Sequence, residues 1–496
     1  MRRFLIACFL IAGASLSLFA QKPNENYKYH ISQTTEPIEV DGVANEAVWQ
    51  QTEVAEDFFM IQPIDTSFAR AKTEVRMTYD TKNIYILVKN FKPVQGTLVV
   101  ESLRRDFNFG KNDNFLLFMD PFNDLTNGFS FGSNAAGAPW DGQMFDGSSM
   151  NLSWDNRWVT AVKNEEDLWV WEAAIPFKSI RYKPGITSWG INFSRLDLTI
   201  AEKSGWAPVP RQFPSAALAY TGVLVWDQPP PAPGPNISLI PYTAVRSTRN
   251  LETFTPSKQS LDIGGDVKIG ITPALNLDLT VNPDFSQVDV DVQQTNLDRF
   301  ELFFPERRQF FLENADLFAT FGYNSIRPFF SRRIGLGVPI LYGARLSGKL
   351  DKNWRIGVLD VQTAAQDSLP GTNYSVFALQ RKVFARSNVR LMMVNKDAIR
   401  YSNEINGFYT RYNRNIGGEF NLASANNLWT GKAMFLKSFT PGQKNDDVVV
   451  AGDINYNNRN LALQWQHEYV GANYNAEVGY VPNAIRNGYY KINPAA

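Results

Sequence analysis

The sequence has few of the residues that carry most metal and nucleophile chemistry. Its 496 residues include one cysteine, Cys8, and two histidines, His30 and His467. Because Cys8 lies in the apolar N-terminal stretch, we expect a mature chain without a disulfide, a thiolate metal site or a catalytic cysteine. The small number of histidines excludes a histidine-rich zinc site and argues against a Ser-His-Asp triad.

Net charge and long apolar runs are missing as well. Lys plus Arg and Asp plus Glu number 49 each, so no net field favours nucleic acid as a partner. After the N-terminal stretch, no run of about 18 apolar residues remains that could form a membrane helix. An exported chain can still enter a membrane without helices.

The N-terminus has the pattern of a secretory signal peptide. Two arginines precede the apolar run Phe4–Ile11, and small residues then lead to Ala20. This pattern predicts a signal peptide over residues 1–20, cleaved after Ala20. The alternative is lipidation at Cys8, but most of the apolar run follows that residue.

A proline-rich stretch divides the rest of the chain. Residues 228–235, QPPPAPGP, cannot pair in a sheet or continue a helix, because proline lacks the backbone N–H and has a fixed φ. In residues 31–227, short β-branched and aromatic segments such as TEVRMTYD and NIYILVKN alternate in polarity and end at Gly, Pro, Asn or Asp. The pattern predicts a β-sandwich.

Residues 236–496 contain longer alternating segments. In LNLDLTV, residues 275–281, apolar side chains alternate with Asn276, Asp278 and Thr280. Segments of about ten residues, joined by tight turns at one end and longer connections at the other, predict an antiparallel outer-membrane-type β-barrel. A large soluble β-sandwich, which also alternates, is the alternative. On either interpretation the fold class is all-β.

Several segments resemble known families. IEVDGVANEAVWQQTE, TKNIYILVKN, RRDFNFGKNDNFLLFMDPFND and LWVWEAAIPFKSIRY resemble the family 9 carbohydrate-binding module as it occurs in Bacteroidetes envelope proteins. VNPDFSQVDVDVQQTNLDRFELFFPERRQFFLEN resembles the signature of the DUF5916 family, whose members follow that module with an outer-membrane-type barrel. The resemblance implies a sugar-binding domain before a barrel.

The C-terminal end departs from that family. Its members usually run longer, and this chain ends in YYKINPAA, without the terminal aromatic residue that many barrel proteins present to their insertion machinery. We therefore expect an incomplete barrel and leave the number of strands open.

The resemblance also implies sugar binding, in which aromatic rings stack on pyranose faces and polar groups bind hydroxyls. The candidates are Trp140 and Trp206, in loop contexts rich in Gly, Pro and Ala, with Asn134, Asp141 and Arg211 beside them. Packing in the core is the alternative role for both tryptophans. Four further tryptophans at strand-like or motif positions are expected in the core: Trp49, Trp169, Trp171 and Trp189.

Acidic residues are numerous but their spacing assigns no metal. Asp41, Asp106, Asp113 and Asp120 carry the oxygen ligands that calcium prefers. No EF-hand spacing occurs, so turn and cap roles are favoured, and we expect no cofactor. No pair of carboxylates for glycoside hydrolysis can be chosen from so many.

The stretch Arg299–Phe318, RFELFFPERRQFFLENADLF, mixes six phenylalanines with both signs of charge. It is too polar for lipid and too rich in phenylalanine for water. We therefore expect a segment of about 284–320 to occupy the barrel lumen or one mouth, where Arg307 and Arg308 pair with carboxylates of the wall. Its charged residues include Glu301, Glu306, Arg307, Arg308 and Glu313.

Two hypotheses about function follow. The first is an outer-membrane β-barrel protein with a periplasmic domain, whose partners are outer-membrane lipid and a glycan or polysaccharide of the envelope. The second is a secreted hydrolase of O-glycosyl bonds that carries a family 9-like binding module. A hydrolase needs two carboxyl groups about 5–9.5 Å apart beside a cleft.

Overall fold

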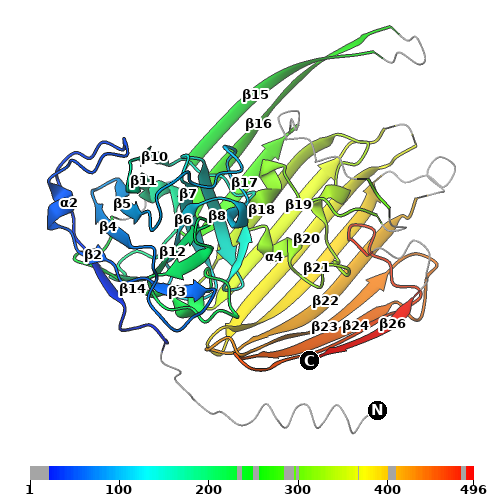
Figure 1. The fold of residues 1–496 in the computed structure, drawn as a ribbon. Helices are drawn as coiled ribbons and strands as arrows, with labels where there is room; N and C mark the ends of the chain where they lie inside the picture. Colours follow the sequence, from blue (N-terminus) through cyan, green and yellow to red (C-terminus); the bar gives the residue numbers. More distant parts are fainter. Residues whose placement is uncertain are drawn as a thin grey trace.

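The computed structural model describes residues 22–231, 237–249, 256–283, 295–297, 301–366, 368–399, 409–481 and 488–496. The expected signal peptide, residues 232–235 of the proline-rich stretch, and residues 284–294 and 298–300 of the expected lumenal segment lie outside these ranges. The described chain is all-β, as expected, with three sheets and a few short helices (Figure 1). None of its helices is long and apolar enough to cross a membrane.

The N-terminal part is a sandwich of two sheets. Its strand pairs are antiparallel, apart from the parallel pair β1 and β14. The first sheet has the order β1-β14-β12-β6-β7-β8-β9, with β13 beside β12 and β3 beside β13. Its strands are β1 (Lys28–Ile31), β3 (Phe59–Gln62), β6 (Asn114–Asp120), β7 (Gly128–Asn134), β8 (Pro139–Phe145), β9 (Ser149–Asn151), β12 (Ser188–Asp197), β13 (Glu202–Gly205) and β14 (Gly222–Trp226). The second sheet comprises, in spatial order, β10 (Val159–Asn164), β11 (Leu168–Pro176), β5 (Asn83–Phe91), β4 (Thr73–Tyr79) and β2 (Val54–Ala55).

Apolar side chains at alternate strand positions fill the space between these two sheets. Val75, Met77 and Tyr79 of β4 are each at most 1% exposed. The rings of Phe115 on β6 and Trp171 on β11, one from each sheet, have centroids 5.5 Å apart. The four tryptophans expected in the core are buried: Trp49, Trp169, Trp171 and Trp189. The predicted sandwich is confirmed.

The third sheet has twelve strands in chain order, each antiparallel to the next. They are β15 (Ile237–Thr248), β16 (Lys258–Thr272), β17 (Leu275–Val281), β18 (Ile340–Lys349), β19 (Trp354–Thr363), β20 (Gly371–Val383), β21 (Ser387–Ile399), β22 (Tyr412–Ala423), β23 (Trp429–Phe439), β24 (Val448–Asn457), β25 (Ala462–Val470) and β26 (Tyr489–Ala495). Among the described residues its edge strands β15 and β26 do not pair with each other, and the sheet curves without closing (Figure 1). This arrangement fits the expected incomplete barrel.

Connections of the twelve-stranded sheet differ in length between its two ends. Short turns join β16 to β17, β18 to β19, β20 to β21, β22 to β23 and β24 to β25, whereas the other connections are longer. The longest, between β17 and β18, contains the helices α3 (Gln309–Leu312) and α4 (Asp316–Ala319) and the 3₁₀ turn η5 (Ser331–Arg333). In the sandwich lie α2 (Val48–Gln51), η2 (Phe109–Lys111), η3 (Phe177–Ser179) and η4 (Leu218–Tyr220).

Candidate functional site

The two faces of the twelve-stranded sheet have opposite chemistry. In β17, Asn276, Asp278 and Thr280 point to the concave face and are at most 8% exposed, while Val281 on the other face is 60% exposed. Buried charges on the concave face of other strands include Arg345, Arg355, Arg390 and Glu419. We call this concave face the inward face. Its polar, buried positions are those that the sequence alternation predicts for a barrel interior.

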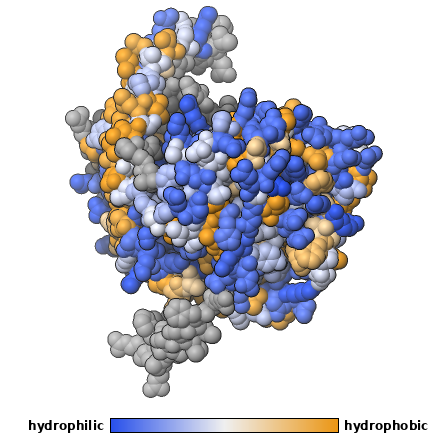
Figure 2. Space-filling view, turned by 90° about the vertical axis from the view of Figure 1, so that its left-hand side faces the viewer, coloured by the Kyte–Doolittle hydropathy of each residue, from blue (hydrophilic) through white to orange (hydrophobic). Residues whose placement is uncertain are grey.

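The convex, outward face is apolar and exposed. The strand register places Phe377 opposite Met393 and Met393 opposite Ile416, so these side chains form one row across β20, β21 and β22. Each is more than two fifths exposed. Further exposed side chains on this face are Val389, Leu391, Phe435, Val450, Ile454 and Trp465. Apolar surface also runs along the projecting β15–β16 hairpin, whereas the sandwich beside it is mostly hydrophilic (Figure 2).

Residues 301–334, which we call the interior segment, lie against the inward face. Their apolar side chains join one hydrophobic cluster with inward side chains of β19 to β25. The segment contributes Phe311, Leu317, Phe318, Phe321, Ile326, Phe329 and Ile334, and the sheet contributes residues such as Leu359, Val376, Met392, Leu436 and Val449. Phe310, Phe311 and Phe318 of the phenylalanine-rich stretch are therefore packed inside the curve of the sheet.

Two strand glycines make room for the interior segment. A Cβ on Gly357 of β19 would lie 2.6 Å from the ring of Phe318, and one on Gly343 of β18 would lie 3.0 Å from the ring of Phe310. Both values are below ordinary van der Waals contact. The backbone of the sheet and the phenylalanine rings of the segment thus approach each other where the side chain is missing.

The described partners of Arg308 lie within the interior segment and not on the wall, where the sequence led us to expect them. Its guanidinium binds Glu306, two residues earlier, at 2.7 Å, and donates to the carbonyls of Ser331 and Ile334. Because Glu306 is only two residues away, the pair with Arg308 forms at a small cost in conformational entropy. Arg307 is half-buried and donates its backbone N–H to Glu306. Glu301 pairs with Arg333 at 2.5 Å.

The segment instead gives carboxylates to cations of the wall. Asp316 of α4 accepts two hydrogen bonds from Arg355 of β19, at 2.6 and 3.0 Å. Glu313 pairs with Lys268 of β16 and accepts from Asn276 of β17 at 2.9 Å. Burial opposes ionisation of Glu313, but the surrounding cations outweigh it and lower its pKa to about 2.

Both tryptophans proposed for sugar stacking are packed in the sandwich. Trp140 lies on β8, is 4% exposed, and joins a cluster with Phe107, Phe118 and Met144. Trp206 follows β13, is 6% exposed, and belongs to the main core. Neither ring offers a face to a ligand in this structure, because neighbouring side chains cover it. Both tryptophan side chains therefore lie in the core in this structure.

The polar candidates beside them lie in different places. Asn134 is buried and closes a turn, since its Oδ1 accepts from the backbone N–H groups of Ala136 and Ala138 and its Nδ2 donates to Ser102. Arg211 is exposed, and its backbone N–H donates to Asp65 at 3.1 Å. The structure does not bring Asn134 and Arg211 to one site with the two tryptophans.

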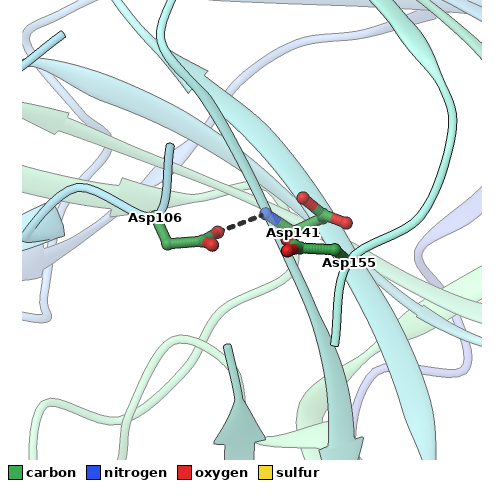
Figure 3. A group of neighbouring side chains, drawn as sticks. All are labelled: Asp106, Asp141 and Asp155. Carbon is green, nitrogen blue, oxygen red and sulfur yellow. Dashed lines mark hydrogen bonds between the residues drawn. The ribbon is translucent and has the colours of Figure 1, made fainter. Parts of the chain in front are cut away.

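Asp141 belongs to a group of three carboxylates with Asp106 and Asp155, whose ligand atoms lie within 4.8 Å of one another (Figure 3). Asp106 accepts a hydrogen bond from the backbone N–H of Asp141 at 3.2 Å. Arg105 pairs with Asp141 and, at 2.7 Å, with Asp155. The single positive charge of Arg105 thus offsets part of the charge of the three carboxylates.

The same three carboxylates are poorly arranged for glycoside hydrolysis. Burial raises the pKa of Asp106 to about 7 and that of Asp141 to about 6, although Arg105 opposes both shifts. Arg105 pairs with both Asp141 and Asp155, so two of the three carboxylates are held by a guanidinium rather than left open to a sugar. The other aspartates considered for calcium accept backbone N–H groups, as expected for turns and caps: Asp41, Asp113 and Asp120.

Two stretches of the chain match known families. Residues 40–206 match the family described as "Carbohydrate family 9 binding domain-like", and residues 233–348 match "Domain of unknown function (DUF5916)". Both family resemblances are confirmed. The family 9-like stretch covers most of the sandwich, and the DUF5916 stretch covers β15 to β18 with the interior segment. No curated protein shows a significant match to the chain.

Solved structures similar to the chain come from the same class of module. A family 9 carbohydrate-binding module from Caldicellulosiruptor kristjanssonii in complex with cellotriose is 14% identical, covers 40% of this chain and 94% of its own, and has a TM-score of 0.31. The same module with glucose has a TM-score of 0.30, at 14% identity, 40% and 96% coverage. A candidate carbohydrate-binding protein from Bacteroides uniformis has a TM-score of 0.33 and is 13% identical. The match covers 40% of this chain and 98% of its own.

Sequence reasoning missed the exposed aromatic rings of the sandwich. Among its described residues, Phe68 is 60% exposed and Phe109 is 45% exposed. Phe68 packs edge-on against Phe59, with ring centroids 4.9 Å apart, and lies three residues after Asp65, the partner of Arg211. Phe109 lies beside the ammonium group of Lys203. An aromatic residue that follows the turn-forming residues Pro, Asp, Thr and Ser in PIDTSFAR was the available hint.

Proposed function

We propose that the protein resides in the outer membrane, with the twelve-stranded sheet in the bilayer and the sandwich in the periplasm, where it binds a glycan of the cell envelope. The main support for this proposal is the burial pattern of the twelve-stranded sheet, which buries polar side chains and exposes apolar ones. Buried charges on the inward face and exposed apolar side chains on the outward face match a strand layer with lipid outside and protein or water inside. A soluble sheet of this size would leave a large apolar patch in water.

Aromatic residues near the strand ends support the same proposal. At the short-turn end, the rings of Trp429 and Tyr456 lie 4.8 Å apart, and Arg381 covers the ring of Trp354. At the opposite end, Tyr342 is 53% exposed and Phe439 is 39% exposed. Two rows of amphipathic rings, separated by aliphatic side chains, suit the two interfaces of a bilayer.

Cell fractionation with a heat-modifiability gel tests the membrane part of the proposal. The mature chain should sediment with outer membranes, require detergent for extraction, and migrate differently before and after boiling. Recovery of the intact chain in the soluble fraction without detergent would contradict it. Such recovery would favour the alternative, a secreted hydrolase.

The glycan-binding part rests on the family 9-like stretch, and we assign the contact to Phe68 of that stretch with Arg211, which follows it. The exposed ring of Phe68 offers a stacking face, and the exposed Arg211 carries donors that can bind hydroxyls. Because these residues come from loops, their replacement should leave the core intact.

A glycan array followed by calorimetry on the strongest hit tests this assignment in the full chain. Phe68→Ala and Arg211→Ala should each weaken binding at least tenfold, whereas Leu103→Ala, which removes a side chain that is 73% exposed, should leave it unchanged. Unaltered affinity in both variants would move the site elsewhere on the sandwich, and an array without signal would count against glycan binding.

A further inference from the structure

The interior segment and the sandwich meet the twelve-stranded sheet through seams of different chemistry. The interior segment shares one large hydrophobic cluster with the inward face. The sandwich does not: among the described residues after 231, only Leu428 packs against one of its hydrophobic clusters. Its contacts with the rest of the chain are mainly ion pairs and hydrogen bonds.

One of these contacts joins three parts of the molecule at Glu313. Arg181, from the sandwich, binds this carboxylate of the interior segment with Nη2 at 2.7 Å and Nε at 3.0 Å. The same guanidinium donates to Asn276 of β17 at 2.6 Å, and Lys268 of β16 completes the group. The Glu313 side chain is 9% exposed, so the charges are held out of water.

A second junction of three parts is centred on Arg390 of β21. Its guanidinium reaches Asp146 of the sandwich at 2.7 Å, Thr320 of the interior segment at 2.7 Å, and Glu419 of β22 at 3.4 Å. The Arg390 side chain is 3% exposed, while that of Asp146 is 39% exposed. At this junction the residue from the sandwich, Asp146, is therefore more exposed to solvent than Arg390.

The remaining polar contacts gather at the short-turn end of the sheet. Asp124, in the loop after β6, pairs with Lys349 at the end of β18 and accepts through its carbonyl from Lys382 at the end of β20. Arg459, in the turn between β24 and β25, pairs with Asp65 at 3.1 Å. Through these contacts the sandwich covers the end of the sheet at which short turns join the strands.

We infer that the sandwich is a detachable lid over the short-turn end of the sheet, whereas the interior segment is a fixed part of the sheet's packing. Separating an apolar cluster exposes its whole surface to water. Charged side chains are hydrated again when an ion pair separates. Opening a seam made of ion pairs therefore costs much less free energy than opening an apolar one. Lid release would uncover Arg390, Lys268 and the basic residues around Asp124 while the interior segment stays in place.

The inference extends the proposed function, because it gives the sandwich a second role as a cover of the sheet's interior. A ligand bound to the sandwich would influence that interior through these contacts, chiefly the junctions at Glu313 and Arg390, which join all three parts. Both junctions would then work as latches, in which the sandwich supplies Arg181 to one and Asp146 to the other.

Distance measurement between two spin labels tests the lid in the full chain. The labels replace Glu166, in the exposed turn between β10 and β11, and Lys444, in the exposed connection between β23 and β24, in a Cys8→Ser background. The parent should give one narrow distance distribution. Asp146→Asn combined with Arg181→Gln should add a longer population, and Glu101→Gln, which breaks the exposed pair with Lys111, should not.

The second experiment repeats the distance measurement on the parent protein at increasing salt concentration. It needs no substitution at either junction. The longer population should grow with salt, since the partly exposed pairs at the seam are screened. A single unchanged distribution in both the double variant and the parent at high salt would overturn the inference. The readout uses neither glycan nor bilayer, so failure of the proposed function would not produce this result.

Discussion

The sandwich and the twelve-stranded sheet are built from the same alternating strands but bury opposite sets of side chains. In the sandwich, Trp169, Trp171 and Trp189 are at most 1% exposed between two sheets. In the twelve-stranded sheet, Arg345 is 1% exposed on the inward face while Leu391 is 52% exposed on the outward face. Alternation therefore identifies a strand with two unlike faces, and the surroundings decide which face is buried.

The two regions are also held together by different interactions. The sandwich is held by aromatic and aliphatic contacts across its sheets, which are non-directional and insensitive to salt. The inward face of the larger sheet combines an apolar cluster with buried ion pairs that need their partners in place. Replacements of equal size should thus have unequal effects in the two regions.

The largest effect is expected where a buried charge loses its partner. Arg355→Met leaves Asp316 of the interior segment uncompensated, and we expect a loss of about 3–5 kcal/mol in the free energy of unfolding. Adding Asp316→Leu should restore most of it, because the pair is then replaced by apolar contacts. Denaturant unfolding of the detergent-solubilised protein measures both; equal loss in the single and double variants would argue against a buried pair.

Reversing the polarity of the outward face should come next. Leu391→Arg places a charge in lipid on the proposed account, and we expect about 2–4 kcal/mol lower stability and poor assembly into vesicles. Leu103→Arg, at a more exposed leucine of the sandwich, should change stability by less than about 0.5 kcal/mol. Folding yield into lipid vesicles compares the two, and similar behaviour would mean that both leucines face water.

Within the sandwich, Glu172 gives stability a dependence on pH. Burial raises its pKa from 4.5 to about 7, although the backbone N–H groups of Asp41 and Gly42 bind its Oε2. Between these values the folded state keeps a proton that the unfolded state has lost, so stability should fall as the pH rises from about 4.5 to about 7.

Replacing this carboxyl tests that dependence. Glu172→Gln should reduce the slope, of which Asp106 and Asp141 also supply a part, and raise stability at pH 8 by at most about 3 kcal/mol, since an amide oxygen can accept the same two hydrogen bonds. Thermal unfolding of the full chain at several pH values, with Glu101→Gln as control, measures it. An unchanged slope in the Gln variant would assign the pH dependence to another group.

The smallest effect concerns the fit between the sheet and the interior segment. Gly357→Ala puts a methyl group 2.6 Å from the Phe318 ring, and overpacking of this kind costs about 1–3 kcal/mol. Phe318→Leu in the same chain should recover part of that loss. If Gly357→Ala alone leaves the unfolding midpoint unchanged, the ring does not lie where the structure has it.

The sequence predicted the strands and their faces well because alternation is a local property. The apolar positions Val75, Met77 and Tyr79 are buried, and the polar positions Asn276 and Asp278 face inward, as their period of two requires. Packing of the phenylalanine-rich stretch against the sheet also followed from its composition, since neither lipid nor water suits it. These inferences needed no knowledge of distant contacts.

Predictions that depended on tertiary contacts fared worse. The small residues around Trp140 suggested a loop, yet Pro139–Phe145 is strand β8, and Ala138 packs with the indole in one cluster. Arg308 was expected to reach the wall, but Glu306 is two residues away and wins by proximity. At the two junctions, Arg181 and Glu313 lie 132 positions apart and Asp146 and Arg390 lie 244 positions apart, which no local pattern reveals.

Accessibility of spin labels at two adjacent positions tests most directly whether the outward face contacts lipid. Leu391→Cys and Met392→Cys, each in a Cys8→Ser background and reconstituted into vesicles, sit on opposite faces of β21, at 52% and 2% exposure. The account predicts that a label at 391 collides freely with oxygen dissolved in the bilayer and not with a water-soluble nickel complex, while a label at 392 is shielded from both. Free collision of the label at 391 with the nickel complex would contradict it.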